Sequence, residues 1–383
     1  MTSSTATTQT VFAEQFREFI KGETNDAVRA LREQAFASFT ASGFPTPKNE
    51  DWKYTNVASL VSGQWSVAGG QSQELAAADV EIAGRFAIDR NGFAALNLAF
   101  GEIKVIRIAK DTSVDEPFEL NFSAAENTAI FPHVLVIAET GSKATIIESY
   151  ASSTKSFTNA AVQVIVEDNA SVTHYRVQKD GPEAFNVGTT EVSLGRDSRY
   201  DSTNINLGAA ISRHDIDLKF TAEGGEAWVD GLYMLNGSQH SDTHSVIDHT
   251  VPNCVSHQTY KGVLNDHSRG VFNGKVFVRE NAHGTDAQQS NKNLLLSNDA
   301  RVDTKPQLEI FNDDVKCAHG ATVGQLEEEE LFYLLTRGLP KTLAKNLLTY
   351  GFAEAIIRKI GIESIKSDLD AAVLNRLSVK LEV

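Results

Sequence analysis

The chain has 383 residues, of which 41% are hydrophobic and 22% are charged, and its net charge at pH 7 is −15. This composition is that of a folded globular protein and differs from that of a disordered chain. A pI near 5.1 excludes the broad positive field that binding to a nucleic acid backbone requires. No apolar stretch has the length of a membrane-spanning helix. We therefore expect neither nucleic acid nor a membrane as a partner.

The N-terminus and the cysteines bear on the cellular compartment. The first ten residues contain no Lys or Arg and no apolar core, so we expect a frayed tail rather than a targeting signal. The two cysteines, Cys254 and Cys317, are too few to cross-link a chain of this length. A reducing, cytoplasmic location fits best.

The first hundred residues are predicted to form a helical and mixed domain, residues 1–100. Apolar side chains recur at helical spacing between residues 11 and 44, which predicts two amphipathic helices. Gly22 and Gly43 are the expected stops of these helices. Residues 58–100 show only weak periodicity, and we predict no more than a mixed connecting region there.

Residues 101–325 are predicted to be β structure, because short runs of Val, Ile, Thr, Phe and Tyr alternate with Gly, Asn and Asp. The segments 134–148 and 162–175 resemble each other at an offset of 28 residues. Turn signals recur about every fifteen residues, as the coils of a stacked solenoid require. We therefore predict a solenoid, with a β-sandwich as the alternative. The turn signals are Asn265-Asp266, Glu280-Asn281, Asn298-Asp299 and Asn312-Asp313.

After Gln325 the pattern becomes helical again, and residues 326–383 are predicted to form a C-terminal helical domain. Four acidic residues lie in the first turn of the first helix, and Arg337 and Gly338 end it, as the helix dipole and the C-cap prefer. A second helix is expected to run to about Lys359 and a third from about 362 to 377. The second helix carries an apolar stripe that we expect to pack in the core. Its members are Leu343, Leu347, Leu348, Phe352, Ile356 and Ile357.

Cys317 and His319 form the main candidate for chemistry. In a strand, residues i and i+2 project from the same face, so this thiolate and imidazole could reach one iron or zinc ion. Two ligands do not complete a site, and the rest would have to come from another chain or from transient thiols. The alternative is a buried cysteine that packs as a small hydrophobe beside a hydrogen-bonded histidine.

A second cluster contains His240, Asp242 and His244, which would share one strand face, with His249 further along. These residue types suit a metal, but surface His and Asp on an exposed solenoid face are the alternative. The sequence has no GxxxxGK[ST] loop, HExxH helix, GxSxG elbow or GxGxxG turn. We therefore expect that the chain does not hydrolyse nucleotide itself.

Three segments resemble the SufD family, whose members are scaffold subunits of SUF-type iron-sulfur cluster assembly complexes. They are NEDWKYTNV at 49–57, FAALNLAF at 93–100 and KPQLEIFNDDVKCAHGATVGQLEEEELFYLLTRGLP at 305–340. The resemblance covers essentially the whole chain. It implies a mainly β protein, a right-handed parallel β-helix flanked by N-terminal and C-terminal α-helical domains.

The same resemblance implies partners and a function. SufB would pair with the chain through the β-helix, and the ATPase SufC would dock on the C-terminal helices. Apart from the resemblance, the exposed strand edges at the ends of a β-helix would allow the isolated chain to form a homodimer. His319, with Cys317 just before it, would contribute ligands for a transient iron-sulfur cluster at the SufB interface. Reduced flavin is associated with such complexes, but the sequence assigns it to no residue. The segment expected to meet SufC contains Leu331, Phe332, Tyr333 and Arg337.

Two other functions remain open on the residues alone. Parallel β-helices also host polysaccharide-active enzymes, although these are often secreted and need clustered carboxylates. The other is a stand-alone metal-binding structural protein that uses the cluster from His240 to His249.

Overall fold

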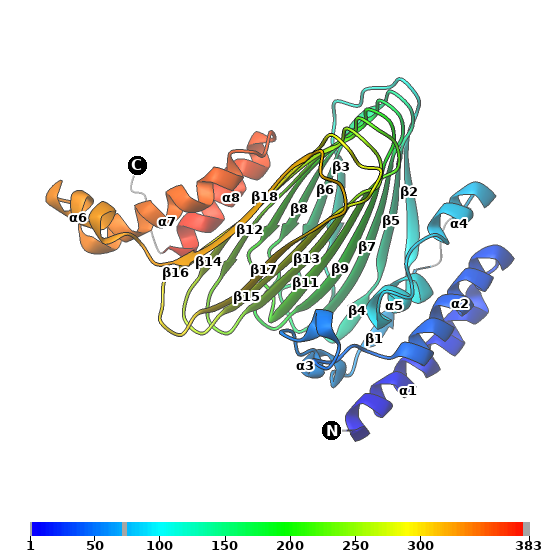
Figure 1. Cartoon of the computed structure of the whole chain (residues 1–383). Coiled ribbons are helices and arrows are strands. Elements are labelled where there is room, and N and C mark those ends of the chain that lie inside the picture. The colour runs from blue at the N-terminus through cyan, green and yellow to red at the C-terminus, as the bar shows by residue number, and fades with distance from the viewer. Residues whose placement is uncertain (1, 71–74, 378–383) are drawn as a thin grey trace.

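The structure is a computed structural model that describes residues 2–70 and 75–377. Two parallel sheets form a solenoid, with helices from the two ends of the chain packed on its outside (Figure 1). The predicted parallel β-helix with N-terminal and C-terminal helices is therefore confirmed. The β-sandwich alternative is wrong, because the strands within both sheets pair in parallel and not in antiparallel hairpins.

The chain alternates between the sheets, so that from β7 onward each strand pairs with the strand two positions earlier. Sheet A has ten strands and sheet B has eight. Sheet A contains β1 (Ser66–Ala68), β2 (Glu102–Ile108), β4 (Thr128–Ile130), β5 (Pro132–Ala138), β7 (Phe157–Val166), β9 (Phe185–Leu194), β11 (Ile211–Phe220), β13 (His240–His249), β15 (Arg269–Val278) and β17 (Arg301–Ile310). Sheet B contains β3 (Phe118–Phe122), β6 (Lys143–Tyr150), β8 (Ser171–Gln178), β10 (Arg199–Asn206), β12 (Glu226–Leu235), β14 (Val255–Leu264), β16 (Thr285–Leu295) and β18 (Val315–Gly324).

The repeat found in the sequence is one coil of the solenoid. Val134 pairs with Val162 and Val136 with Val164 in the register of β5 and β7, at the predicted offset. The predicted turn signals lie between strands, and Asp266, between β14 and β15, has a φ of 53°. Asn and Asp adopt this left-handed region more readily than most residues, which explains their recurrence at the corners.

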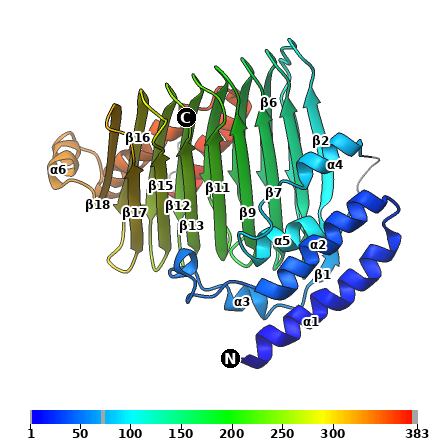
Figure 2. The same cartoon turned by 45° about the vertical axis from the view of Figure 1, so that its right-hand side comes forward.

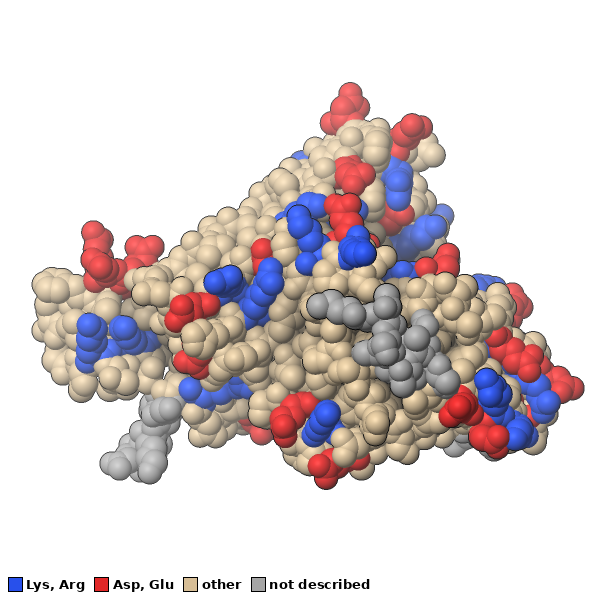
Figure 3. Space-filling model, turned by 90° about the horizontal axis from the view of Figure 1, so that it is seen from below, with Lys and Arg blue, Asp and Glu red and all other residues tan. Residues whose placement is uncertain are grey.

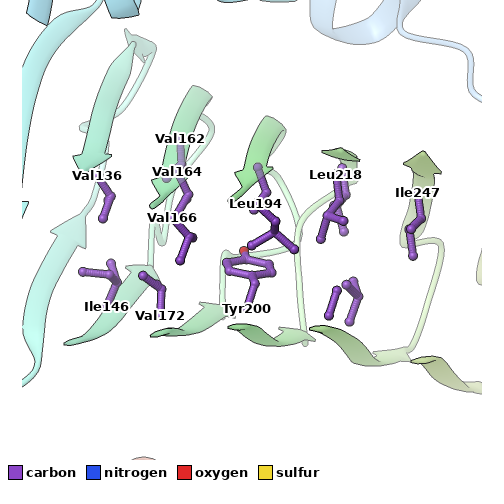
Figure 4. Close-up of a cluster of buried hydrophobic side chains, with 14 of the residues drawn as sticks. Val136, Ile146, Val162, Val164, Val166, Val172, Leu194, Tyr200, Leu218 and Ile247 are labelled. Atoms are coloured by element: carbon purple, nitrogen blue, oxygen red, sulfur yellow. The ribbon is translucent and has the colours of Figure 1, made fainter. Parts of the chain in front are cut away.

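Part of the interior is a continuous apolar core, because inward side chains of successive coils stack in register. Burying each large aliphatic side chain contributes roughly 1.5–3 kcal/mol. In Figure 4 the side chains from sheet A point toward those from sheet B. The labelled members of this core are Val136, Ile146, Val162, Val164, Val166, Val172, Leu194, Tyr200, Leu218 and Ile247.

The other part of the interior is polar. His174 contacts the carboxylate of Glu148 through Nε2 and the hydroxyl of Tyr200 through Nδ1, the latter at 2.8 Å. Burial alone would raise the pKa of Glu148, but His174 and Arg176 hold it below its ordinary value. Because buried charges are costly unless they are paired, this cluster depends on all its members being present.

The N-terminal helices cover part of the outer face of sheet A (Figure 2). An apolar cluster joins them to Phe131, Phe157 and Phe185 of the solenoid. Residues 2–10 are helical, so the expected frayed tail is wrong for them; the predicted stop at Gly43 is confirmed, with a φ of 65°. The elements are α1 (Thr2–Phe19), η1 (Ile20–Gly22), α2 (Asp26–Ser42), η2 (Glu50–Trp52), α3 (Ala58–Val61), α4 (Ala77–Ala83) and α5 (Gly92–Phe100).

The C-terminal helices are α6 (Glu328–Thr336), α7 (Lys341–Ile357) and α8 (Glu363–Arg376). The second half of α7 and α8 pack on the outer face of sheet B, whereas α6 projects away from the solenoid (Figures 1 and 2). The prediction of one buried stripe along α7 is therefore wrong for Leu343 and Leu347, which are 36% and 45% exposed. Ile356 and Ile357, on the half that reaches the sheet, are buried as predicted.

Among the described helices, no segment combines the length and the apolar composition that crossing a membrane would need. On the face shown in Figure 3, acidic and basic side chains are interspersed. That face therefore offers no extended basic field of the kind that nucleic acid binding uses.

Candidate ligand and partner site at the open end of the solenoid

Strands β17 and β18 form the last coil of the solenoid. Within the described chain, β17 pairs only with β15, and β18 pairs only with β16. Figure 2 shows this coil at the end of the solenoid away from α1 and α2. The free backbone edge of such a terminal strand is a template for pairing with another chain.

The side chains of the last coil are not covered. Neither β17 nor β18 contains a buried residue within its described span, whereas β15 alternates buried and half-buried positions. Ile310, Phe311 and Val323 are 43%, 55% and 48% exposed. Exposed apolar side chains gathered at an uncapped end are typical of a surface that another molecule covers.

Cys317 and His319 lie on the inward face of β18, and the inward side chains of a further coil would stack on them. Cys317 is half-buried and packs against the core, and burial raises the pKa of its thiol. His319 lies two residues further along the same strand and is exposed, because no coil lies above it. The end of the solenoid thus exposes the imidazole of His319 to any molecule that binds there. The thiol of Cys317 lies beside this imidazole, at the edge of the apolar core.

These two side chains do not form a complete metal site. Among the described residues, no three His, Cys, Asp or Glu side chains are grouped so that they could hold a metal ion. The other cysteine, Cys254, is buried and its thiol donates to the carbonyl of Pro252 at 3.3 Å. Any metal held at His319 and Cys317 would therefore need ligands from outside the described chain.

The second histidine cluster has a different role. His240, Asp242 and His244 share the outward face of β13 as predicted, but Asp242 accepts a hydrogen bond from Arg213 at 2.8 Å and another from Thr55. Burial would raise the pKa of Asp242, yet Arg213 and His244 hold it well below its ordinary range. His249 faces inward, stacked on a phenylalanine ring. The cluster is therefore a buried ion-pair network.

This network fastens the N-terminal segment 49–57 to sheet A. The guanidinium of Arg213 donates to the carbonyl of Asp51 at 2.6 Å and lies 3.9 Å from the ring centre of Trp52. The hydroxyl of Thr55 lies 2.8 Å from Nε2 of His240. Sequence reasoning missed Arg213, because a single arginine in a β-strand gives no signal of its distant partners.

The residues predicted to contact a partner lie on α6 or directly after it, and α6 projects away from the solenoid. Phe332 and Tyr333 are 68% and 56% exposed, and Leu331 is half-buried. Arg337 follows the helix with its guanidinium 5.0 Å from the ring centre of Tyr333. Gly338 then adopts a φ of 86°, which allows the sharp turn into α7.

Several polar contacts attach the end of α7 and α8 to sheet B, and three of them lie where α7 and α8 end. Lys359 pairs with Asp230 at 2.6 Å, the backbone N–H of Gly361 donates to the hydroxyl of Tyr175 at 2.9 Å, and Arg376 donates to the carbonyl of Met234 at 2.7 Å. Burial raises the pKa of Asp230, and Lys359 opposes that effect. The free helix α6 is thus connected through α7 to fixed points on the solenoid.

Comparisons with known proteins match the N-terminal region and the β-helix core of this architecture. The family described as "SUF system FeS cluster assembly, SufBD core domain" matches residues 121–352, and the "SufBD protein N-terminal region" matches residues 3–81. An iron-sulfur cluster assembly SufBD family protein of Synechocystis is 35% identical over 87% of this chain and 76% of its own length. The iron-sulfur cluster assembly protein SufD of Escherichia coli is 30% identical over 90% of this chain and 92% of its own length. SufD of Bacillus subtilis is 31% identical over 70% of this chain and 62% of its own length.

Proposed function

The chain belongs to the SufBD family of SUF-system iron-sulfur cluster assembly proteins, and from this premise we propose that it is a non-catalytic scaffold subunit that acts as SufD does. Its partners are SufB, at the open end of the solenoid, and the ATPase SufC, at the C-terminal helices. The observation that carries the proposal is the last coil, whose edges and inward face stay uncovered in the described chain.

SufB pairing is supported by the chemistry of that end. A second β-helix that continued the stack would pair with the edges of β17 and β18 and cover Phe311 and Val323. The isolated chain would use the same surface to form a homodimer. The interface would enclose His319 and Cys317, and a thiolate from SufB would supply the ligand that this chain lacks. The iron-sulfur cluster is the transient cargo of that interface.

SufC docking is supported by the free apolar surface of α6 and the first half of α7. A partner that bound Phe332 and Tyr333 and then moved would carry α6 and the first half of α7 with it. Because the far end of α7 is attached to sheet B, this movement would be transmitted to the solenoid. ATP-driven closure of two SufC subunits would then twist the helical domains and open or reshape the interface with SufB.

We treat residues 1–100, 101–325 and 326–383 as N-terminal, β-helix and C-terminal domains, and we place the protein in the cytoplasm, where its two unpaired cysteines would stay reduced. Reduced flavin would belong to the assembled complex, and we assign it to no residue of this chain.

Co-expression of the tagged chain with SufB and SufC tests the partner assignments. We expect a stable ternary complex from wild type, loss of SufB with retention of SufC for Val323→Lys, and no effect of Ala109→Lys. Ala109 is the matched control because it is exposed in the turn after β2, at the other end of sheet A. Absence of a complex with wild type would contradict the proposed function.

A further inference from the structure

Beneath the open end lies a buried glutamine in direct register with His319. Gln289, on β16, pairs with His319 on β18, and its side chain is 3% exposed inside the solenoid. Residues in register on neighbouring parallel strands point to the same face, about 4.8 Å apart. Gln289 is therefore the first interior side chain below the imidazole.

Hydrogen bonds fix the orientation of the Gln289 amide. Its Nε2 donates to Oε1 of Gln258 at 2.8 Å, and Nε2 of Gln258 donates in turn to Oγ of Ser245 at 2.8 Å. Gly274 on the facing sheet leaves room for this arrangement, because a Cβ there would lie 2.3 Å from Nε2 of Gln289. The amide nitrogen therefore already donates to an interior acceptor, and the amide oxygen is the atom that can accept a further hydrogen bond.

The amide oxygen has no such partner within the described chain. Oε1 of Gln289 is buried, and no hydrogen-bond donor of the described residues reaches it. Leaving a buried acceptor without a donor is unfavourable, so such atoms are rare and usually have a use. The imidazole directly above carries an N–H donor in either neutral tautomer.

We propose that Gln289 is a positioning residue for His319: a rotation of the exposed His319 side chain brings its ring N–H to the unpaired Oε1 of Gln289, and this bond then holds the imidazole over the end of the core. A neutral imidazole has one N–H and one lone pair, so fixing the N–H on the inner nitrogen directs the lone pair of the other nitrogen outward. The consequence for cluster assembly rests on the proposed function, in which that outward nitrogen is a ligand. Histidines that bind metals commonly donate their other N–H to a fixed acceptor in this way.

The tautomer of His319 tests the positioning role in the isolated chain, without any cluster. In protein labelled with 15N-histidine, with the His319 signals assigned by His319→Ala, we expect one dominant tautomer at a pH about 2 units above the ordinary histidine value. Gln289→Met should return the signals to the mixture of a free imidazole, and Gln289→Glu, which keeps an acceptor, should restore the dominant form. Gln288→Met is the matched control, because Gln288 is its exposed neighbour on the opposite face of β16.

Identical tautomer ratios in wild type and Gln289→Met would overturn the inference. Should Gln289→Met fail to fold, Gln289→Asn withdraws the acceptor while keeping an amide, and the same comparison applies. Cluster yield in the assembled complex separates this inference from the proposed function: Gln289→Met should lower it about 10-fold if His319 is a ligand. A full yield with His319→Ala, together with a tautomer that depends on Gln289, would support the positioning role and refute the ligand role.

Discussion

The ammonium group of Lys359 lies 2.6 Å from Oδ2 of Asp230 and joins the end of α7 to the outer face of sheet B. The carboxylate is 4% exposed, whereas the lysine side chain is 41% exposed. Lys359→Met should lower the free energy of unfolding by about 1–3 kcal/mol, because it leaves the buried carboxylate without its charged donor. Urea unfolding measures this, with Lys366→Met, which removes only a surface pair, as the control. Equal losses in the two variants would mean that the contact does not fasten the helices.

The imidazole of His249 should make the protein less stable in acid. Burial lowers the pKa of His249 to about 4, and the nearby Asp248 offsets this only in part. An unfolded histidine takes up its proton near pH 6.5, so the stability that the neutral imidazole contributes is complete above about pH 6.5 and is lost as the pH falls toward 4. Between about pH 7.5 and 5, this one group should cost about 2 kcal/mol.

Chemical denaturation at the two pH values checks this prediction. His249→Gln should remove about 2 kcal/mol of the pH dependence, because glutamine does not titrate. An unchanged pH dependence in His249→Gln would show that folding does not shift the pKa of His249.

Phe332 should matter for binding and not for folding. Its side chain is 68% exposed on α6, so Phe332→Ala removes little buried area and should shift the free energy of unfolding by less than about 0.5 kcal/mol. Loss of a large aromatic anchor should weaken SufC binding by more than about 2 kcal/mol, or roughly 30-fold. Titration calorimetry with SufC measures the affinity, and Thr336→Ala, an exposed position on the same helix, is the control. Unchanged affinity in Phe332→Ala would place SufC elsewhere.

His244 should not be a metal ligand. Its Nε2 lies 3.1 Å from Asp242, whose carboxylate is already paired with Arg213. Metal analysis of the purified chain should therefore give the same content for wild type and His244→Ala. A stoichiometric ion that disappears in His244→Ala would instead support the stand-alone metal-binding protein.

The sequence alone predicted the β region well because its signals are local. Strand runs, corner residues such as Asp266 and the offset between Val134 and Val162 all lie within one or two coils. It did not predict which face of a strand turns inward where both faces are polar. In β14, Ser256, Gln258 and Tyr260 face the interior, although the neighbouring outward positions are polar too.

The sequence also gave no sign of long-range contacts between domains. Leu343 and Leu347 are exposed because the first half of α7 does not lie against the sheet. The helical periodicity of α7 does not indicate where along the helix the contact with the sheet begins. Arg213 and Asp51 are far apart in the chain, and nothing in either segment identifies the other. Strand β1 was missed for the same reason, because a three-residue strand is defined by its pairing with β4.

Iron-sulfur reconstitution of the purified ternary complex, for wild type and His319→Ala, tests the central claim most directly. We expect that His319→Ala forms the same complex with SufB and SufC but yields far less cluster, with Gln288→Met matching wild type. A complex that carries His319→Ala and assembles cluster at the wild-type yield would contradict the claim that this end of the solenoid supplies a ligand.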